Sequence, residues 1–314
     1  MKHKIITLAI LFIFIFGLAL SFVIISGCSP EDTVDTTDNL NNDAPTLEAL
    51  NFTLMGDGTY GVSAKKGVDL PKKIIIPATY NNIPVAFIET NAFKNCSTIT
   101  SIVIPEGINR INYGAFYECV NLTDINIPST CKSIGTLAFF KCTSLKNITI
   151  SDGIESIGNS AFFYCSNLEN IVLPDSITSI ENCAFSDCSN LKSVKLPFKL
   201  TTIGSQMFIR CKKLSSIEIP TKVNIIEDGA FAECDNLTSV IVPKSIRQFK
   251  SSIFYNSNAM ESIYYCGTAS EWSKINIMQY NNELDYIVFY YYSENQPTDN
   301  GDYWHYVDGI PTIW

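Results

Sequence analysis

Seven cysteines follow one another at intervals of 23 residues, and thiols are side chains that can bind metals, form disulfides or act as nucleophiles. They are Cys96, Cys119, Cys142, Cys165, Cys188, Cys211 and Cys234. Zinc sites bring cysteines together in close pairs, so single residues 23 apart do not predict a metal site. Neighbouring repeats could bring two Cα atoms within disulfide distance, but each cysteine occupies an inward position in an apolar register. We therefore expect a column of buried free thiols and no cofactor.

Other residues with chemical potential are scarce. Cys131, Cys183 and Cys266 fall outside the period, and the sequence assigns them no role. After residues 1–27, His305 is the only histidine, and no Gly-x-Ser-x-Gly nucleophile motif accompanies it. The sequence therefore predicts a protein that is not an enzyme, and a hydrolase that uses the C-terminal region is the least favoured alternative.

The elements that carry the cysteines repeat with the same period, marked by a phenylalanine three residues before each cysteine position. These residues are Phe93, Phe116, Phe139, Phe162, Phe185, Phe208, Phe231 and Phe254. An apolar residue follows six places after each phenylalanine, and Ile or Val follows nine places after it. A period of this length over eight copies is typical of a solenoid, whose units bury their apolar faces only by stacking.

The apolar spacing changes within each repeat. Ile171 and Leu173 alternate like one face of a short strand, and Pro174 ends that strand because it lacks a backbone donor. The later spacing of Ile177 and Ile180 predicts turns and short helical pieces that return the chain on the opposite side. About eight stacked coils would thus share one parallel sheet.

The consensus Ala-Phe-x-x-Cys-x-x-Leu-x-x-Ile-x-Ile-Pro-x-x-Ile-x-x-Ile resembles the BspA-type leucine-rich repeats of bacterial surface proteins. The match covers residues 91–265, with Ser151 in place of a proline and Ser257 in place of the last cysteine. The resemblance implies a right-handed leucine-rich repeat coil. It also implies that residues 49–90 form an N-terminal β half-coil cap and that residues 266–314 form an aromatic C-terminal cap.

The resemblance further implies recognition, that is, adhesion to a protein or glycan of a host, a matrix or a neighbouring cell. Leucine-rich repeat proteins commonly bind ligands on the exposed face of the sheet, where the outward positions of this chain vary freely among the repeats. These positions are Val103, Asn126, Thr149, Val172, Lys195, Glu218, Ile241 and Tyr264. The alternative is a solvated face without a ligand, which would make the protein a structural scaffold of the cell envelope.

The N-terminal sequence predicts export. An apolar run over residues 5–25 follows two lysines and leads to Cys28, in a pattern that resembles the lipobox of bacterial lipoproteins. Cleavage would remove residues 1–27 and leave Cys28 lipidated, whereas an uncleaved membrane helix is the alternative. Both place the rest of the chain on the outer side of the cytoplasmic membrane, because the lysines hold the N-terminus inside.

Residues 28–48 are rich in Ser, Thr, Asp and Asn and contain no Lys or Arg, which predicts a disordered acidic tether. The formal net charge of the chain is −9, and no basic cluster of the kind that meets phosphates appears. This composition argues against nucleic acid as a partner. We expect a monomer whose partners are the membrane, through its lipid anchor, and an extracellular protein or glycan.

Overall fold

The computed structural model describes residues 46–299 and 301–314, which belong to one compact unit spanning Asp43–Trp314. The predicted signal peptide (1–27), the lipidation site Cys28 and nearly all of the tether (28–48) lie outside the described residues. In the described part of the chain, no helix is long and apolar enough to span a bilayer.

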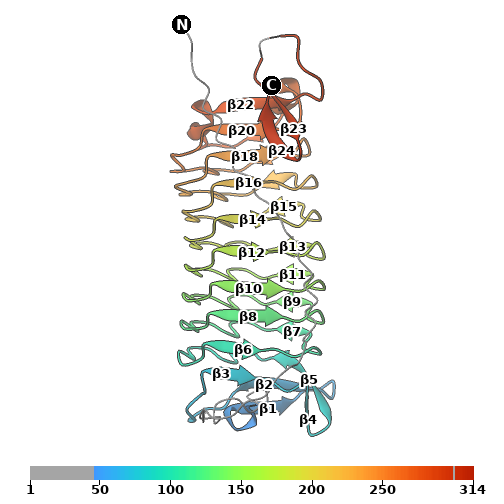
Figure 1. Cartoon of the computed structure of the whole chain (residues 1–314), viewed down its shortest axis with the longest axis vertical. Coiled ribbons are helices and arrows are strands. Elements are labelled where there is room, and N and C mark those ends of the chain that lie inside the picture. Colours follow the sequence, from blue (N-terminus) through green and yellow to red (C-terminus); the bar gives the residue numbers. More distant parts are fainter. Residues whose placement is uncertain (1–45, 300) are drawn as a thin grey trace, which may run out of the picture. The chain divides into compact units, whose positions relative to one another are not determined.

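Ten strands lie above one another along one side of a stack of coils (Figure 1). They are β3 (Lys73–Ile75), β6 (Ser101–Val103), β8 (Asp124–Ile127), β10 (Asn147–Ile150), β12 (Asn170–Val172), β14 (Ser193–Lys195), β16 (Ser216–Glu218), β18 (Ser239–Val242), β20 (Ser262–Tyr265) and β22 (Val288–Tyr292). Paired strands run parallel, and a residue of one coil lies opposite the corresponding residue of the next coil, as Ile171 lies opposite Val194. The predicted repeat solenoid is confirmed.

The return side of the coils also forms strands, which the sequence did not predict. They are β7 (Arg110–Ile111), β9 (Ser133–Ile134), β11 (Ser156–Ile157), β13 (Ser179–Ile180), β15 (Thr202–Ile203), β17 (Ile225–Ile226), β19 (Gln248–Phe249) and β21 (Asn276–Ile277). Ile180 is therefore extended and not in a helical piece, because each coil hydrogen-bonds to the same segment of the next coil. The expectation of a single sheet is corrected to two columns of parallel strands.

The N-terminal end is closed by β strands. The hairpin of β1 (Leu50–Leu54) and β2 (Tyr60–Ala64) is antiparallel, and β2 pairs in parallel with β5 (Ile83–Ile88), which also pairs with β4 (Thr79–Tyr80). The 3₁₀ turn η1 (Leu47–Ala49) precedes β1. The backbone N–H of Thr46 donates to Ile75 O at 3.1 Å, so the ordered part already includes the last residues of the predicted tether.

The C-terminal end continues the parallel stack beyond residue 265, where the sequence placed its boundary. Strand β22 pairs in parallel with β20 over four residues. The short helix α1 (Ala269–Trp272) and the 3₁₀ turn η2 (Asn282–Asp285) lie between these two strands. The chain then ends in a hairpin of β23 (Tyr303–Val307) and β24 (Ile310–Ile313).

The phenylalanines form the centre of the core. All eight side chains are at most 1% exposed, and adjacent rings stack with centroids 5.1–5.9 Å apart. Phe139 and Phe162, for example, are 5.2 Å apart with ring planes 2° from parallel. Because each ring contacts only the rings of the two adjacent coils, the core is a sum of nearest-neighbour contacts.

The cysteine column lies beside the phenylalanine column. From Cys119 onward each thiol of the column is completely buried. Each donates a hydrogen bond to the carbonyl oxygen of the column phenylalanine in the preceding coil, 26 residues earlier, as Cys165 Sγ does to Phe139 O at 3.1 Å. Cys96, at the start of the column, is half-buried, and its thiol donates to Lys94 O at 3.8 Å instead. All ten described cysteines are free thiols.

The three cysteines outside the column also follow the repeat. Cys131 is completely buried at the inward position that Ile177 occupies two coils later. Cys183 occupies a turn with a φ of 57° and is half-buried. Cys266 is half-buried. It directly follows strand β20, at the position that Pro243 occupies one repeat earlier. Each therefore replaces a standard residue of its coil.

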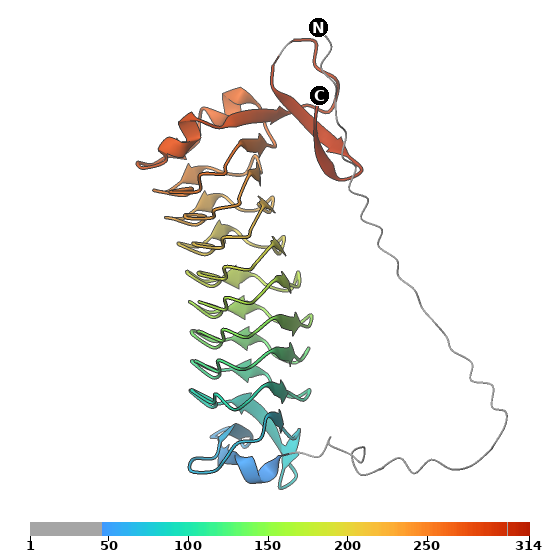
Figure 2. The same ribbon diagram turned by 60° about the vertical axis from the view of Figure 1, so that its left-hand side comes forward.

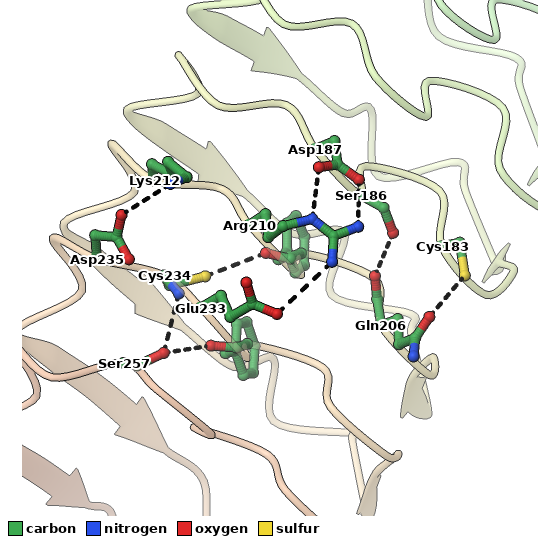
Figure 3. Close-up of polar contacts among 12 residues, drawn as sticks. Cys183, Ser186, Asp187, Gln206, Arg210, Lys212, Glu233, Cys234, Asp235 and Ser257 are labelled. Atoms are coloured by element: carbon green, nitrogen blue, oxygen red, sulfur yellow. Dashed lines mark hydrogen bonds and ion pairs between the residues drawn. The ribbon is translucent and has the colours of Figure 1, made fainter.

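Charged side chains on the turns connect adjacent coils. Arg210 donates two hydrogen bonds to Asp187, at 2.6 and 2.7 Å, and lies 3.7 Å from Glu233 of the following coil (Figure 3). Lys212 and Asp235 form a further pair at 3.3 Å. These residues are one period apart, so the alternation of charge favours the native register of the stack.

Ser257 performs the hydrogen bonding of a cysteine in the last copy of the column. Its hydroxyl donates to Phe231 O at 2.7 Å and accepts from Cys234 N at 3.0 Å (Figure 3). Ser257→Ala would leave the buried Cys234 N–H unpaired, so we expect a loss of about 1–3 kcal/mol in the free energy of unfolding, measured by urea denaturation. Ser257→Cys restores a donor and acceptor and should lose less than about 1 kcal/mol. An alanine variant as stable as the cysteine variant would contradict this role.

Candidate binding face

The eight residues that the sequence proposes for ligand contact lie at outward positions of eight neighbouring strands. Val103 lies in β6, Asn126 in β8, Thr149 in β10, Val172 in β12, Lys195 in β14, Glu218 in β16, Ile241 in β18 and Tyr264 in β20. Their neighbours in each strand are buried, as Ile171 is beside Val172. We call this row of side chains the sheet face.

The sheet face differs along its length. The first six residues are exposed, whereas Ile241 and Tyr264 are half-buried. Val172 is 73% exposed and Val103 is 44% exposed, although both are apolar. Neither side chain contributes to the core, so their exposure leaves apolar area available to a ligand.

The C-terminal hairpin contacts one end of the sheet face. Strand β23 pairs with β22 over only two residues, and Figure 2 shows the hairpin standing off from the last coil. Trp304 is completely buried, packs edge-on against Tyr264 with centroids 5.5 Å apart, and donates from Nε1 to Tyr265 O at 3.0 Å. Tyr306 Oη lies 3.5 Å from Glu218 Oε1 in β16, several coils earlier.

A hollow of about 370 Å³ lies between the hairpin and the sheet face. Its lining combines serine hydroxyls with the side chains of Glu218, Ile241 and Tyr264 and with Pro311 of β24. Burial near the Glu218 carboxylate raises the pKa of Tyr306, so its hydroxyl stays protonated and can donate. The sequence contained no sign of this contact, because its partners are 88 residues apart and belong to no repeat.

Polar side chains border the sheet face at the start of the strands. Asn147 Nδ2 donates to Asp124 Oδ1 at 2.9 Å, and Lys192 Nζ lies 2.7 Å from Glu169 Oε2. Asp124, Asn147 and Glu169 line a shallow hollow of about 340 Å³ that runs from β8 toward β14. The charges of these residues are largely matched within the protein, so this border supplies hydrogen-bonding groups more than net charge.

His305, the histidine considered for hydrolysis, lies in β23. Its ring stacks on Trp314 with centroids 3.6 Å apart. Its backbone pairs with Thr312 of β24. The imidazole is thus a packing element of the hairpin.

This geometry defines a class of protein: a parallel β solenoid of the leucine-rich repeat type, with an exposed sheet face and a hairpin at its C-terminal end. Residues 71–174 and 155–293 match the BspA type Leucine rich repeat region, in six copies. The chain belongs to the BspA-type leucine-rich repeat family, as the resemblance predicted. It is a repeat scaffold, and the family is generally non-enzymatic.

Solved structures share the fold. The chain is 29% identical to a leucine-rich repeat protein from Bacteroides ovatus ATCC 8483, over 81% of this chain and 71% of that one, with a TM-score of 0.61. It is 24% identical to a leucine-rich repeat protein of T. pallidum, over 69% of this chain and 90% of that one, with a TM-score of 0.52. No curated protein matches the chain.

Proposed function

We propose that this protein is a cell-surface recognition scaffold that binds an extracellular protein or glycan on the sheet face. The observation that carries the proposal is the exposed row from β6 to β14, where side chains of different chemistry stand one strand apart. In this stretch Val103 and Val172 expose apolar surface and Lys195 adds a charge. A repeat scaffold holds such side chains at fixed spacing, so several weak contacts can act together.

We further propose that the solenoid is displayed on the outer side of the cell, anchored through a lipid on Cys28. The apolar run and the small residues before Cys28 support this placement. Two acyl chains suffice for stable anchoring. Metabolic labelling with a palmitate analogue should label the protein, and Cys28→Ala should abolish the label.

The sheet face can be tested with a pair of variants matched in charge. Val172→Glu/Lys195→Glu alters the exposed row, whereas Lys199→Glu/Thr201→Glu makes the same change in net charge in the turn between β14 and β15. We expect the first variant to lose at least about tenfold in binding of the purified solenoid to immobilised matrix proteins, mucins and glycans, because a charge buried in an interface is costly.

The control variant should bind within about twofold of the unmodified protein. Equal losses in both variants would indicate a general charge effect and would overturn the assignment to the sheet face. If the unmodified solenoid adheres to none of the surfaces, the recognition proposal itself fails.

A further inference from the structure

A hollow of about 660 Å³ lies at the carboxyl ends of β18 and β20, and none of the eight residues of the sheet face lines it. One wall is the turn between β18 and β19, with Lys244 and Arg247. The other wall is the segment after β20, with Cys266, Glu271 and Lys274. We call it the basic hollow.

The basic hollow gathers positive charge on an acidic protein. Lys244, Arg247 and Lys274 are exposed, and among the described residues none of them forms an ion pair with a carboxylate. In contrast, Arg210 and Lys212 on the turns are paired with carboxylates of neighbouring coils. These three cations are therefore not held in ion pairs by the fold, although the chain as a whole carries a formal charge of −9.

The single carboxylate of the hollow is already engaged. Glu271 Oε2 accepts hydrogen bonds from Thr268 N at 2.8 Å and from Thr268 Oγ1 at 3.2 Å, in the capping box of α1. Hydrogen bonds from Thr268 lower the pKa of Glu271, and the charges of Lys244 and Lys274 lower it further. The Glu271 carboxylate offsets only one of the three positive charges, so the lining of the hollow keeps a net positive charge.

Arg247 is held in position for a ligand. Its Nη1 donates to Lys244 O at 2.9 Å and to Ile246 O at 3.1 Å. The Nε and Nη2 groups donate no hydrogen bond to another described residue. A guanidinium fixed in this way loses less conformational entropy when its remaining donors bind an oxyanion in a bidentate manner.

We propose that the basic hollow binds a sulfate or phosphate ester carried by an extracellular glycan. Two lysines and a fixed guanidinium match a tetrahedral oxyanion, which several donors can contact at once. The volume is about twenty times the share of one water molecule, about 30 Å³, and so has room for a sugar ring beside the ester group. This site does not depend on the sheet face, and either one can bind without the other.

The Cys266 thiol does not oppose such a ligand. Burial raises the pKa of Cys266 to about 11, with the nearby Glu218 adding to the rise. The thiol is therefore neutral at physiological pH and adds no negative charge to the wall.

The test is a titration of the purified protein with glucose 6-sulfate, glucose 6-phosphate and glucose at low ionic strength, followed by calorimetry or NMR shifts. We expect an ester to bind, glucose to show no binding, and affinity to fall as salt is raised. Lys244→Ala/Arg247→Ala should weaken ester binding by at least about tenfold, since it removes two of the three cations. Preference between the two esters would tell a sulfated glycan from a phosphorylated one.

Lys212→Ala/Lys213→Ala removes the same charge elsewhere on the surface and should change ester affinity less than about twofold. Lys274→Ala changes one exposed residue on the opposite wall, and we expect it to weaken ester binding about fivefold. It keeps the proposal testable if the double variant is poorly folded. Equal losses in the control, full binding by both hollow variants, or no ester binding at all would each overturn the proposal. Adhesion through the sheet face would be untouched by these results.

Discussion

The protein is expected to unfold when the pH is raised above about 9, with an unusually steep loss of stability. Six thiols of the column, Cys119 to Cys234, are buried, and burial raises the pKa of every one of them; Cys234, for example, is raised to about 12. The unfolded chain loses these protons near its ordinary value of 9.0, whereas the folded chain keeps them. Stability is therefore complete below about pH 9 and falls as the pH rises toward the folded values.

The size of this effect follows from the number of protons. Each thiol that stays protonated only in the folded state contributes about 1.4 kcal/mol per pH unit, so six contribute about 8 kcal/mol per pH unit. That slope is comparable with the whole stability of a typical domain, about 5–15 kcal/mol. Urea unfolding followed by circular dichroism in the presence of a reductant, from pH 7 to pH 11, measures it directly.

Variants separate the thiols from the lysines and tyrosines that titrate in the same range. Cys165→Ala/Cys188→Ala should reduce the slope by two protons, about 3 kcal/mol per pH unit, whatever it does to stability at pH 7. Cys183→Ala, which removes one half-buried thiol outside the column, is the control. A double variant with an unchanged slope, or stability that is flat up to pH 11, would show that the column does not control alkaline unfolding.

Phe162→Ala is expected to cost about 3–5 kcal/mol, because it removes a completely buried ring and leaves a cavity. The ring lies between Phe139 and Phe185, with centroid distances of 5.2 and 5.4 Å, so its loss breaks two stacked contacts. In a solenoid each coil contacts only its neighbours, and this variant therefore weakens the connection between the two halves of the stack. Urea denaturation should show a lower midpoint and a broader transition.

The adjacent residue supplies the control. Phe163 is half-buried and stacks on Phe140 with centroids 5.2 Å apart at the edge of the stack. We expect Phe163→Ala to cost about 1 kcal/mol, since less apolar area is removed from the core. Similar losses for both variants would contradict the central role of the phenylalanine column.

Much of this architecture could be predicted from the sequence, because comparison among repeats separates packing positions from surface positions. The residue types at the positions of Phe162 and Cys165 stay nearly constant from coil to coil, because burying these apolar side chains away from water stabilises each coil. The position of Val172 varies freely, which indicated an outward side chain. Cys96 has the same place in the repeat, but it is half-buried and its thiol donates to Lys94 O, a difference that the sequence pattern did not indicate.

The sequence alone determined the period, the register and the inward residues of the coils, since these follow from local spacing and the burial of apolar groups. Only the tertiary structure decided three features: the second column of strands, the contact of Tyr306 with Glu218, and the gathering of Lys244, Arg247 and Lys274. Backbone pairing on the return side depends on stacking and not on side-chain type. The contact of Tyr306 with Glu218 joins segments that share no period. Lys274 lies in the irregular segment after β20, so no repeated pattern in the sequence places it beside Lys244 and Arg247.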